Sequence, residues 1–310
     1  MNILVTGGAG FIGSHITDEY IKRNHKVVVV DNLSTGSIEN VNKKAVFYKA
    51  DICKDNLGHL LEKHKIEVIN HHAAQIDVRK SVEKPVFDLR VNLEATVKLL
   101  QASVKYNIKK FIFASTGGAI YGEQTQYPAG ENHTANPLSP YGITKLASEK
   151  YLYYYKKIYN LNYVILRYGN VYGPRQNAKG EAGVVSIFLE KMLKNVQPVI
   201  NGTGRQTRDF VFVKDVALAN ARALKFPESD VFNISSNTET TVVKLFDLIN
   251  NYFGKKFKKV FGPPKIGEQY RSYLSNGKAN KIFKWKPETN LNDGLKETYD
   301  YYYELILRKH

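Results

Sequence analysis

Residues 2–13 read Asn2-Ile3-Leu4-Val5-Thr6-Gly7-Gly8-Ala9-Gly10-Phe11-Ile12-Gly13, and this stretch decides the fold of the 310-residue chain. The first five residues form a short apolar run, which predicts a β-strand. The glycines that follow predict a tight turn, and the amphipathic stretch from Phe11 to about Arg23 predicts a helix. A strand, a glycine-rich turn and a helix in this order favour a nucleotide-binding α/β fold.

The turn glycines indicate which ligand this fold binds. Because they lack Cβ atoms, Gly7 and Gly10 let a pyrophosphate approach the N-terminus of the predicted helix, where N–H groups and the helix dipole favour negative charge. Gly13 permits close packing of the helix on the strand. The spacing is Gly-x-x-Gly-x-x-Gly rather than Gly-x-Gly-x-x-Gly. A glycine-rich turn without a ligand is the alternative.

A second apolar run, Lys26 to Val30, predicts a second strand, and Asp31 follows it. An acid about 20 residues past the glycines can accept hydrogen bonds from the adenosine ribose hydroxyls. The Asp31 charge would repel a 2′-phosphate, and Asn32-Leu33-Ser34 supplies no arginine to receive one. The sequence therefore favours NAD over NADP, with a plain turn aspartate as the alternative.

Tyr141 and Lys145 lie in the stretch Ser139-Pro140-Tyr141-Gly142-Ile143-Thr144-Lys145, within a predicted helix. Four residues make just over one helical turn, so both side chains lie on one face, where the ammonium can lower the pKa of the phenol. A phenolate can act as a base. Tyr-x-x-x-Lys also arises by chance, but here it follows a dinucleotide-binding turn and Ser115-Thr116, and together these indicate a redox enzyme.

Strand and helix patterns alternate through the first half of the chain, which predicts an α/β fold with a doubly wound parallel (Rossmann) sheet. We expect residues 1–170 to form an NAD-binding domain, to which segments near residues 210–235 return. Residues 171–310 should form mainly a smaller substrate-binding lobe. The predicted strands lie near residues 46–48, 68–70, 111–113 and 164–166, and the predicted helices near 57–63, 93–106, 141–159, 184–194, 213–225 and 242–252.

The composition bounds the possible partners. Lys and Arg number 45 against 29 Asp and Glu, a formal net charge of +16 that would attract polyanions. The lysines are scattered, without an arginine-rich arm or an aromatic RNA-binding signature, so we expect no nucleic-acid partner. The single cysteine, Cys53, rules out an internal disulfide and a cysteine-based metal cluster, and we expect no metal. Apolar runs of strand length and the absence of a secretory signal predict a cytoplasmic protein without a membrane span.

With these motifs in order, the chain resembles the extended short-chain dehydrogenase/reductase family, and within it the UDP-glucose (UDP-galactose) 4-epimerases. The similarity covers nearly the whole length. The segments that carry it are residues 6–13, Asp31-Asn32-Leu33-Ser34-Thr35-Gly36, Asp51-Ile52, His72-Ala73-Ala74-Gln75, Ser115-Thr116-Gly117-Gly118-Ala119-Ile120-Tyr121-Gly122, residues 140–145, Tyr168-Gly169-Asn170-Val171-Tyr172-Gly173-Pro174-Arg175, and Arg208-Asp209-Phe210-Val211.

The resemblance implies three catalytic residues. Tyr141 would accept the proton of the sugar 4-hydroxyl, and Lys145 would bind the nicotinamide ribose. Thr116 would hydrogen-bond the 4-oxygen. Here the chain departs from epimerases that have three consecutive serines, and depending on the register either Thr116 or Gly117 occupies the place of the last serine. Ser115 is the reserve candidate for this role. The residues implied to bind NAD are Gly7, Gly10, Phe11, Ile12, Asp31, Asn32, Ser34, Gly36, Asp51, Ile52, Ala73, Ala74, Gln75, Asn92, Ser115, Tyr141, Lys145 and Tyr168.

The substrate implied by the resemblance is a UDP-sugar. Arg208 and Arg271 would clamp its diphosphate, because guanidinium donors suit phosphate oxygens. Thr116, Tyr141 and Asn170 would contact the sugar, and Gly183-Val184-Val185 would supply backbone N–H groups to the nucleotide. A residue at or near Ser272 lines the sugar pocket in the family, and a serine leaves room for an acetamido group, so UDP-N-acetylglucosamine is a further candidate substrate.

Three other functions are weighed against epimerisation. The dehydratase branch carries an Asp-Glu pair directly after the threonine, where this chain has Gly117-Gly118, so elimination has no proton shuttle here. UDP-glucuronate epimerases or decarboxylases need a site for the C6 carboxylate, which we cannot identify. A catalytically silent NAD-binding scaffold or sensor is the third. The predicted helices at 93–106 and 141–159 match those of a dimer interface in the family, so a homodimer is expected.

Overall fold

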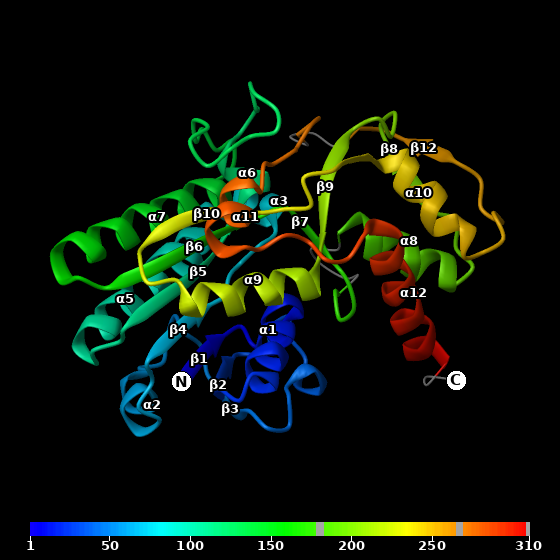
Figure 1. Cartoon of the computed structure of the whole chain (residues 1–310). Helices are drawn as coiled ribbons and strands as arrows, with labels where there is room; N and C mark the ends of the chain where they lie inside the picture. Colours follow the sequence, from blue (N-terminus) through cyan, green and yellow to red (C-terminus); the bar gives the residue numbers. More distant parts are fainter. Residues whose placement is uncertain (178–182, 265–268, 308–310) are drawn as a thin grey trace.

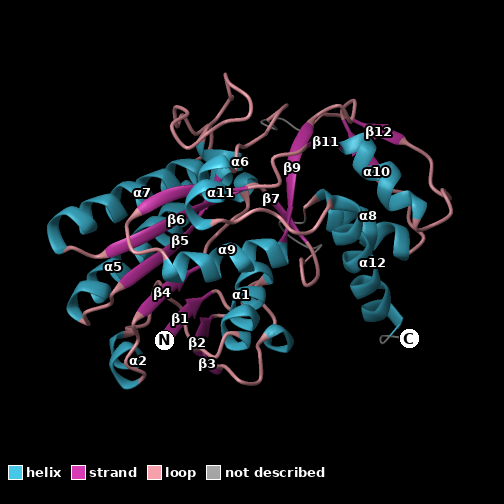
Figure 2. Ribbon diagram, viewed as in Figure 1, coloured by secondary structure: helices cyan, strands magenta, loops and turns pink. Residues whose placement is uncertain are grey.

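The computed structural model describes residues 1–177, 183–264 and 269–307. Its centre is a seven-stranded sheet, whose strands are magenta in Figure 2, with the strand order β10-β6-β5-β4-β1-β2-β3. All neighbouring strands of this sheet run parallel, and the strand order reverses between β1 and β4. The strands are β1 (Asn2–Thr6), β2 (Lys26–Asp31), β3 (Val46–Lys49), β4 (Val68–His71), β5 (Lys110–Thr116), β6 (Asn162–Tyr168) and β10 (Asp230–Ile234).

Helices cover both faces of the central sheet (Figure 1). On one face, α1 (Phe11–Lys22) and α9 (Val213–Lys225) pack against strand residues such as Val5 and Val29. On the other, α2 (Gly58–Lys63), α5 (Ala95–Lys105) and α7 (Pro140–Tyr159) pack against residues such as Leu4 and Val28. Successive strand residues point to opposite faces, so the continuous apolar runs are buried on both sides.

Short helical segments follow three strands of the central sheet, β2, β4 and β5. After β2 comes the 3₁₀ turn η1 (Ile38–Asn40). After β4 come α3 (Val78–Glu83), α4 (Pro85–Leu89) and the π-helical turn η2 (Arg90–Glu94), which runs directly into α5. After β5 comes α6 (Gly117–Ile120). These segments occupy the carboxyl edge of the sheet, where ligands of doubly wound folds bind.

A smaller lobe lies to one side of the central sheet (Figure 1). Its described strands form a three-stranded sheet of β7 (Asn170–Tyr172), β9 (Thr207–Phe212) and β11 (Glu239–Thr241), and a two-stranded sheet of β8 (Val199–Asn201) and β12 (Val260–Gly262). Its helices are α8 (Val184–Leu193), α10 (Val242–Asn251) and α12 (Leu291–Leu307). The lobe has its own core, which includes Phe188, Phe246 and Leu295. Helix α11 (Gly277–Phe283) packs beside β10.

The predicted fold class is confirmed, and each predicted strand and helix is present to within a few residues of its predicted bounds. The helix predicted at residues 93–106 begins inside the π-helical turn rather than as a regular α-helix. The short helices α3, α4, α6 and α11 were not predicted, since four to seven residues carry too little of a 3.6-residue period. None of the described helices has the length and apolar character of a membrane span.

Candidate active site

The turn between β1 and α1 has the geometry of a pyrophosphate cradle. Gly7 has a φ of +69°, and a Cβ at this position would lie 2.6 Å from the backbone N of Ala73. The Gly10 N-cap position of α1 receives no side-chain cap from the described residues. The first N–H groups of α1, at Phe11 and Ile12, therefore remain available to an anion.

Asp31 ends β2 and supports this turn. Its carboxylate accepts hydrogen bonds from the backbone N–H groups of Ala9 (3.0 Å) and Leu33 (2.8 Å). Burial raises the pKa of Asp31, and these hydrogen bonds act in the opposite direction. The structure thus gives Asp31 the turn-supporting role that the sequence analysis named as the alternative, and its contact with a ribose stays a prediction. Asn32, Ser34 and Gly36 follow in the same loop, and a Cβ at Gly36 would lie 2.9 Å from the carbonyl carbon of Ala9.

The next strand ends also carry predicted residues. Asp51 and Ile52 follow β3, where the Asp51 carboxylate accepts a hydrogen bond from Cys53 N (3.0 Å) and Ile52 is buried. Tyr168 ends β6 and is buried. Its hydroxyl accepts a hydrogen bond from Asn220 Nδ2 (2.9 Å) and shares another with His72 Nε2 (2.9 Å). These contacts place Tyr168 at the sheet edge, with its hydroxyl already engaged.

The segment after β4 is fixed by a buried carboxylate that the sequence analysis missed. Asn92 Oδ1 accepts a hydrogen bond from Gln75 N (2.8 Å), and Asn92 Nδ2 donates to Gln75 O (2.8 Å). Asp88, which is fully buried, accepts from Gln75 Nε2 (2.9 Å), from Asn92 Nδ2 (2.9 Å) and from the Thr144 hydroxyl (2.8 Å). Asn92 therefore holds the loop Ala73-Ala74-Gln75, and Asp88 joins this loop to α7.

Tyr141 and Lys145 lie at the start of α7, facing the end of β5. Ser139 caps the helix by accepting a hydrogen bond from Gly142 N (3.2 Å). The Lys145 ammonium is buried, donates to Ala114 O (2.9 Å) and lies 5.9 Å from the centre of the Tyr141 ring. Thr116 is the last residue of β5, two positions after Ala114. The structure therefore brings Tyr141, Lys145 and Thr116 to one edge of the sheet.

Ser115 and Gly117, the two alternatives to Thr116, make contacts elsewhere in the fold. The Ser115 hydroxyl is buried and donates to Glu149 Oε1 at 2.6 Å. Adjacent strand residues point to opposite faces, so Ser115 and Thr116 do not share a direction. A Cβ at Gly117 would lie 2.3 Å from Leu274 Cδ1. Between the candidates for the third catalytic residue, this geometry favours Thr116.

The predicted substrate residues Asn170, Gly183, Val184 and Val185 lie on β7 and at the start of α8, in the smaller lobe. Asn170, in β7, has a buried Oδ1 without a hydrogen-bond partner in the described part of the chain. A buried polar atom of this kind commonly awaits a ligand or water. Gly183 is the N-cap residue of α8, and Val184 and Val185 are the first residues of that helix, so their N–H groups stand at a helix N-terminus.

The two predicted arginines lie on neighbouring backbone segments. Arg208, in β9, donates from Nη1 to Thr207 O (2.7 Å). Arg271 pairs with Glu239 through two hydrogen bonds, from Nε to Oε1 (2.6 Å) and from Nη2 to Oε2 (2.8 Å). The buried Ser272 donates from its backbone N to Thr207 O (3.2 Å). A diphosphate at Arg271 would have to share or displace the carboxylate of Glu239, a partner that the sequence analysis missed.

Comparisons with known proteins place this geometry in a family. Residues 3–235 match the NAD dependent epimerase/dehydratase family, and this match spans more than half of the chain. The chain belongs to this family. The predicted family is therefore confirmed, and so is its dependence on NAD.

Three solved structures of relatives resemble the whole chain. UDP-glucose 4-epimerase from Thermotoga maritima, solved with UDP-glucose, is 45% identical with a TM-score of 0.97, covering 99% of this chain and 100% of that one. UDP-glucose 4-epimerase from Thermus thermophilus, solved with NAD, is 40% identical with a TM-score of 0.92, covering 97% and 99%. UDP-N-acetylglucosamine 4-epimerase from Methanobrevibacter ruminantium M1 is 34% identical with a TM-score of 0.93, covering 98% of each chain.

The residues at the sheet edge fit the cofactor of this epimerase/dehydratase family. A Cβ would close the space over Gly7, and the N-terminus of α1 points into the same turn. Asp31 is a carboxylate at the end of β2, where an acid suits ribose hydroxyls. These three features would hold the pyrophosphate and the adenosine ribose of NAD.

Acidification should destabilise the protein through His15. This α1 histidine is buried, and its Nε2 lies 3.0 Å from Pro174 O. Burial lowers the pKa of His15 from 6.5 to about 4, so the folded state resists protonation. The stabilising contribution is complete above pH 6.5 and falls by about 1.4 kcal/mol per pH unit as the pH drops towards 4.

The measurement is urea unfolding at pH 7 and pH 5. Between these values the wild type should lose about 2 kcal/mol more unfolding free energy than His15→Gln does. An equal loss in both proteins would contradict the prediction, because the remaining titrating groups are common to both.

Proposed function

We propose that this family member is a nucleotide-sugar 4-epimerase that interconverts UDP-glucose and UDP-galactose through a transient 4-keto sugar. The observation that carries the proposal is the placement of Tyr141 and Lys145 on one side of α7, beside Thr116, at the edge that holds the glycine turn. The relatives named as UDP-glucose 4-epimerases support the choice of substrate.

Each residue of the proposed centre has one task. When bound, NAD would accept the hydride from C4 of the sugar and, as NADH, would return that hydride to the other face of the 4-keto sugar. Tyr141 takes the proton of the 4-hydroxyl and returns it to the other epimer. The Lys145 ammonium, which donates to Ala114 O, would stabilise the phenolate and bind the nicotinamide ribose. The Thr116 hydroxyl donates to the 4-oxygen.

The smaller lobe would hold the rest of the substrate. We assign residues 1–170, with the segments near 210–235, to the NAD-binding domain, and residues 171–310 mainly to the substrate-binding lobe. The Oδ1 of Asn170, which has no hydrogen-bond partner among the described residues, would face the substrate, and the N-terminus of α8 would offer N–H groups to the nucleotide. Arg208 and Arg271 would clamp the diphosphate. If the sugar is held less tightly than the diphosphate, the 4-keto sugar can rotate in its pocket and present its other face to the cofactor.

The test follows UDP-galactose by proton NMR after incubation with the purified protein, without added NAD. Formation of UDP-glucose would establish 4-epimerisation with a retained cofactor. If no conversion occurs even with NAD added, the proposal fails. UDP-glucuronate, the alternative substrate class, would then be tried first. NAD that copurifies without turnover of any UDP-sugar would favour a catalytically silent scaffold or sensor.

The same assay tests the breadth of sugar specificity. Ser272 is buried and small, and it lies next to Arg271 in the segment that pairs with β9. If Ser272 lines the sugar pocket, the protein will also epimerise UDP-N-acetylglucosamine, as the name of one solved relative suggests. Ser272→Tyr should then lower kcat/KM for the acetamido sugar at least about 10-fold while sparing UDP-galactose, because the ring fills that space. Absence of turnover of the acetamido sugar by the wild type would end this hypothesis.

We also propose a cytoplasmic homodimer. Large apolar side chains are exposed on α7 and on the neighbouring α3 and α4, including Val86 (70%), Val82 (62%), Ile143 (55%) and Tyr153 (55%). Exposed apolar side chains gathered on neighbouring helices commonly mark an interface. The family expectation names the helices at residues 93–106 and 141–159, and of these α7 carries the exposed apolar residues. Light scattering of the purified protein tests the dimer.

A further inference from the structure

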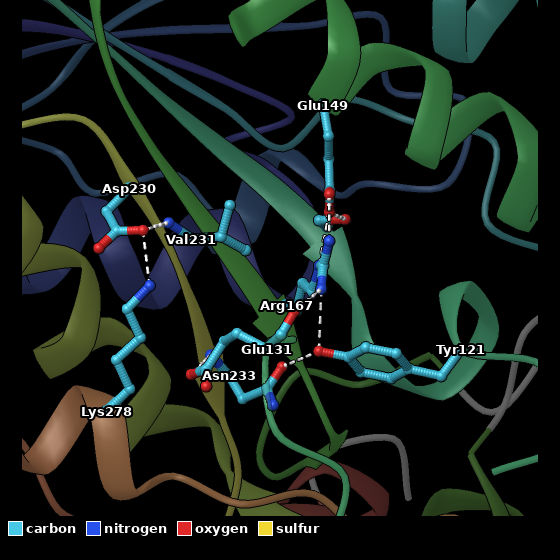
Figure 3. Close-up of polar contacts among 9 residues, drawn as sticks. Tyr121, Glu131, Glu149, Arg167, Asp230, Val231, Asn233 and Lys278 are labelled. Carbon is cyan, nitrogen blue, oxygen red and sulfur yellow. Dashed lines mark hydrogen bonds and ion pairs between the residues drawn. The ribbon is translucent and has the colours of Figure 1, made fainter. Parts of the chain in front are cut away.

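A buried ion pair, Arg167–Glu149, joins α7 to β6, the strand that pairs with β5 (Figure 3). Arg167, in β6, donates from Nε to Glu149 Oε1 (2.9 Å) and from Nη2 to Oε2 (2.6 Å). The two side chains are only 8% and 5% exposed. The Ser115 hydroxyl donates to the same Oε1 at 2.6 Å. The Glu149 carboxylate is therefore held by three donors from two strands.

The inner side of α7 joins this pair to the reacting residues. Tyr141, Lys145 and Glu149 follow one another at intervals of four residues, so they lie along one side of the helix. Lys145 holds Ala114 O, and Glu149 holds the Ser115 hydroxyl. Two successive residues of β5 are thus tied to α7 immediately before Thr116. Thr116 is therefore the next residue of β5 after two that are bound to α7.

Arg167 extends the connection to the loop after α6. Its Nη1 donates to the Tyr121 hydroxyl (2.9 Å) and to Glu131 O (3.3 Å). Tyr121 in turn donates to Asn233 Oδ1 (2.8 Å), and Asn233 N donates to Glu131 Oε1 (2.8 Å). Burial acts to lower the pKa of Arg167, but the contacts with Glu149 outweigh it and raise the pKa, so the guanidinium remains charged. The orientation of Glu149 is therefore set by a buried network.

Stability alone does not account for such a pair. Moving two charges out of water is costly, and apolar residues of similar volume are often at least as stabilising. The pair does fix the direction of the Glu149 carboxylate, because Arg167 donates to both of its oxygens. We propose that Glu149, oriented by Arg167, is a positioning residue that holds Thr116 in register with Tyr141 through the Ser115 hydroxyl. The inference rests on the proposed 4-epimerase function.

Ser115→Ala tests the tie with the smallest disturbance. We expect kcat for UDP-galactose to fall about 10-fold or more while KM changes less than about 2-fold, because misplacing a reacting group affects the transition state more than binding. Bound NAD should stay near that of the wild type, although the family resemblance counts Ser115 among the NAD-binding residues, because its hydroxyl donates to Glu149. The melting temperature should also stay near that of the wild type. The matched control is Ser103→Ala, another buried serine, whose hydroxyl donates to Leu99 O (2.8 Å) within α5. Its kcat should be unchanged.

A second variant removes the pair itself. Since deleting one partner leaves an unpaired buried charge, Glu149→Leu and Arg167→Met are combined. This variant should lose kcat at least as strongly as Ser115→Ala, and adding Ser115→Ala to it should cause no further loss, because all three changes break one tie. Asp230→Asn, which breaks the Lys278–Asp230 pair (2.6 Å) on β10, is the ion-pair control and should keep its kcat.

The outcomes separate the two proposals. A wild type that converts UDP-galactose, with Ser115→Ala or a folded Glu149→Leu/Arg167→Met variant at full kcat, overturns the positioning role alone. A fall in melting temperature with kcat intact would likewise assign the pair to stability and overturn it. A wild type that turns over no UDP-sugar overturns the proposed function and this inference with it. If the double variant does not fold, Ser115→Ala still decides.

Discussion

Tyr141→Phe is expected to lower kcat for UDP-galactose about 10²- to 10⁴-fold, the range in which general acid–base catalysis contributes. Phenylalanine keeps the ring and its packing but cannot take or return a proton. Lys145 would keep its bond to Ala114 O, so the end of β5 and the cofactor site should be undisturbed. The rate is measured by NMR, and the NAD content is measured in cofactor released from the denatured protein.

The matched control is Tyr252→Phe in the smaller lobe. Its hydroxyl donates to Asn292 O (3.1 Å), far along the chain from the proposed centre, so the same atom is lost without touching the chemistry. Its kcat should equal that of the wild type. If Tyr141→Phe keeps more than about a tenth of the wild-type kcat with its NAD in place, another group moves the proton, and the assignment of Tyr141 is wrong.

Local patterns account for the part of the site that could be predicted. Tyr141 and Lys145 share one helix, and Gly7 and Gly10 share one turn, so spacing alone places each pair together. The parallel order of the sheet then brings both elements to its carboxyl edge. The fold class followed from the same alternation of apolar strand and helix patterns.

Contacts between distant residues could not be predicted. Glu149 bonds to Ser115, 34 positions earlier, and Asp88 bonds to Thr144, 56 positions later. In the sequence, both acids look like ordinary polar residues of a helix. Only packing shows that Ser115 is already bound, which favours Thr116 for the reaction. This long-range information separates a catalytic hydroxyl from a supporting one.

The contact between Arg271 and Glu239 could not be predicted for the same reason. Its sequence context indicated a phosphate clamp, and Glu239, 32 positions earlier, carries no signal that it lies opposite. The strands that bring the two together, β11 and the segment at Arg271, are too short for a period-2 pattern. Glu239 accepts from two nitrogens of the guanidinium and so sets its direction, and Arg271 Cζ lies 3.9 Å from the centre of the Tyr127 ring.

Gly7→Ala is expected to cost about 2–5 kcal/mol of unfolding free energy and to leave the purified protein without NAD. The φ of +69° disfavours any side chain, and the added methyl would lie 2.6 Å from Ala73 N and 2.8 Å from the carbonyl carbon of His72. Both are backbone atoms at the end of β4, which Asn92 and Asp88 fix through Gln75. These backbone atoms cannot shift without a large cost in free energy. The turn must therefore move away from the position in which it would receive a pyrophosphate.

Urea unfolding and NAD content measure the two effects separately, and Gly130→Ala is the control. At Gly130 an added Cβ meets no described atom within 4 Å, so its unfolding free energy should change by no more than about 0.5 kcal/mol. A Gly7→Ala protein that is as stable as the wild type and carries a full complement of NAD would show that the turn can relax. In that case the close approach to Ala73 would not be what shapes the cofactor site, and the pyrophosphate would have to be held mainly by the N-terminus of α1.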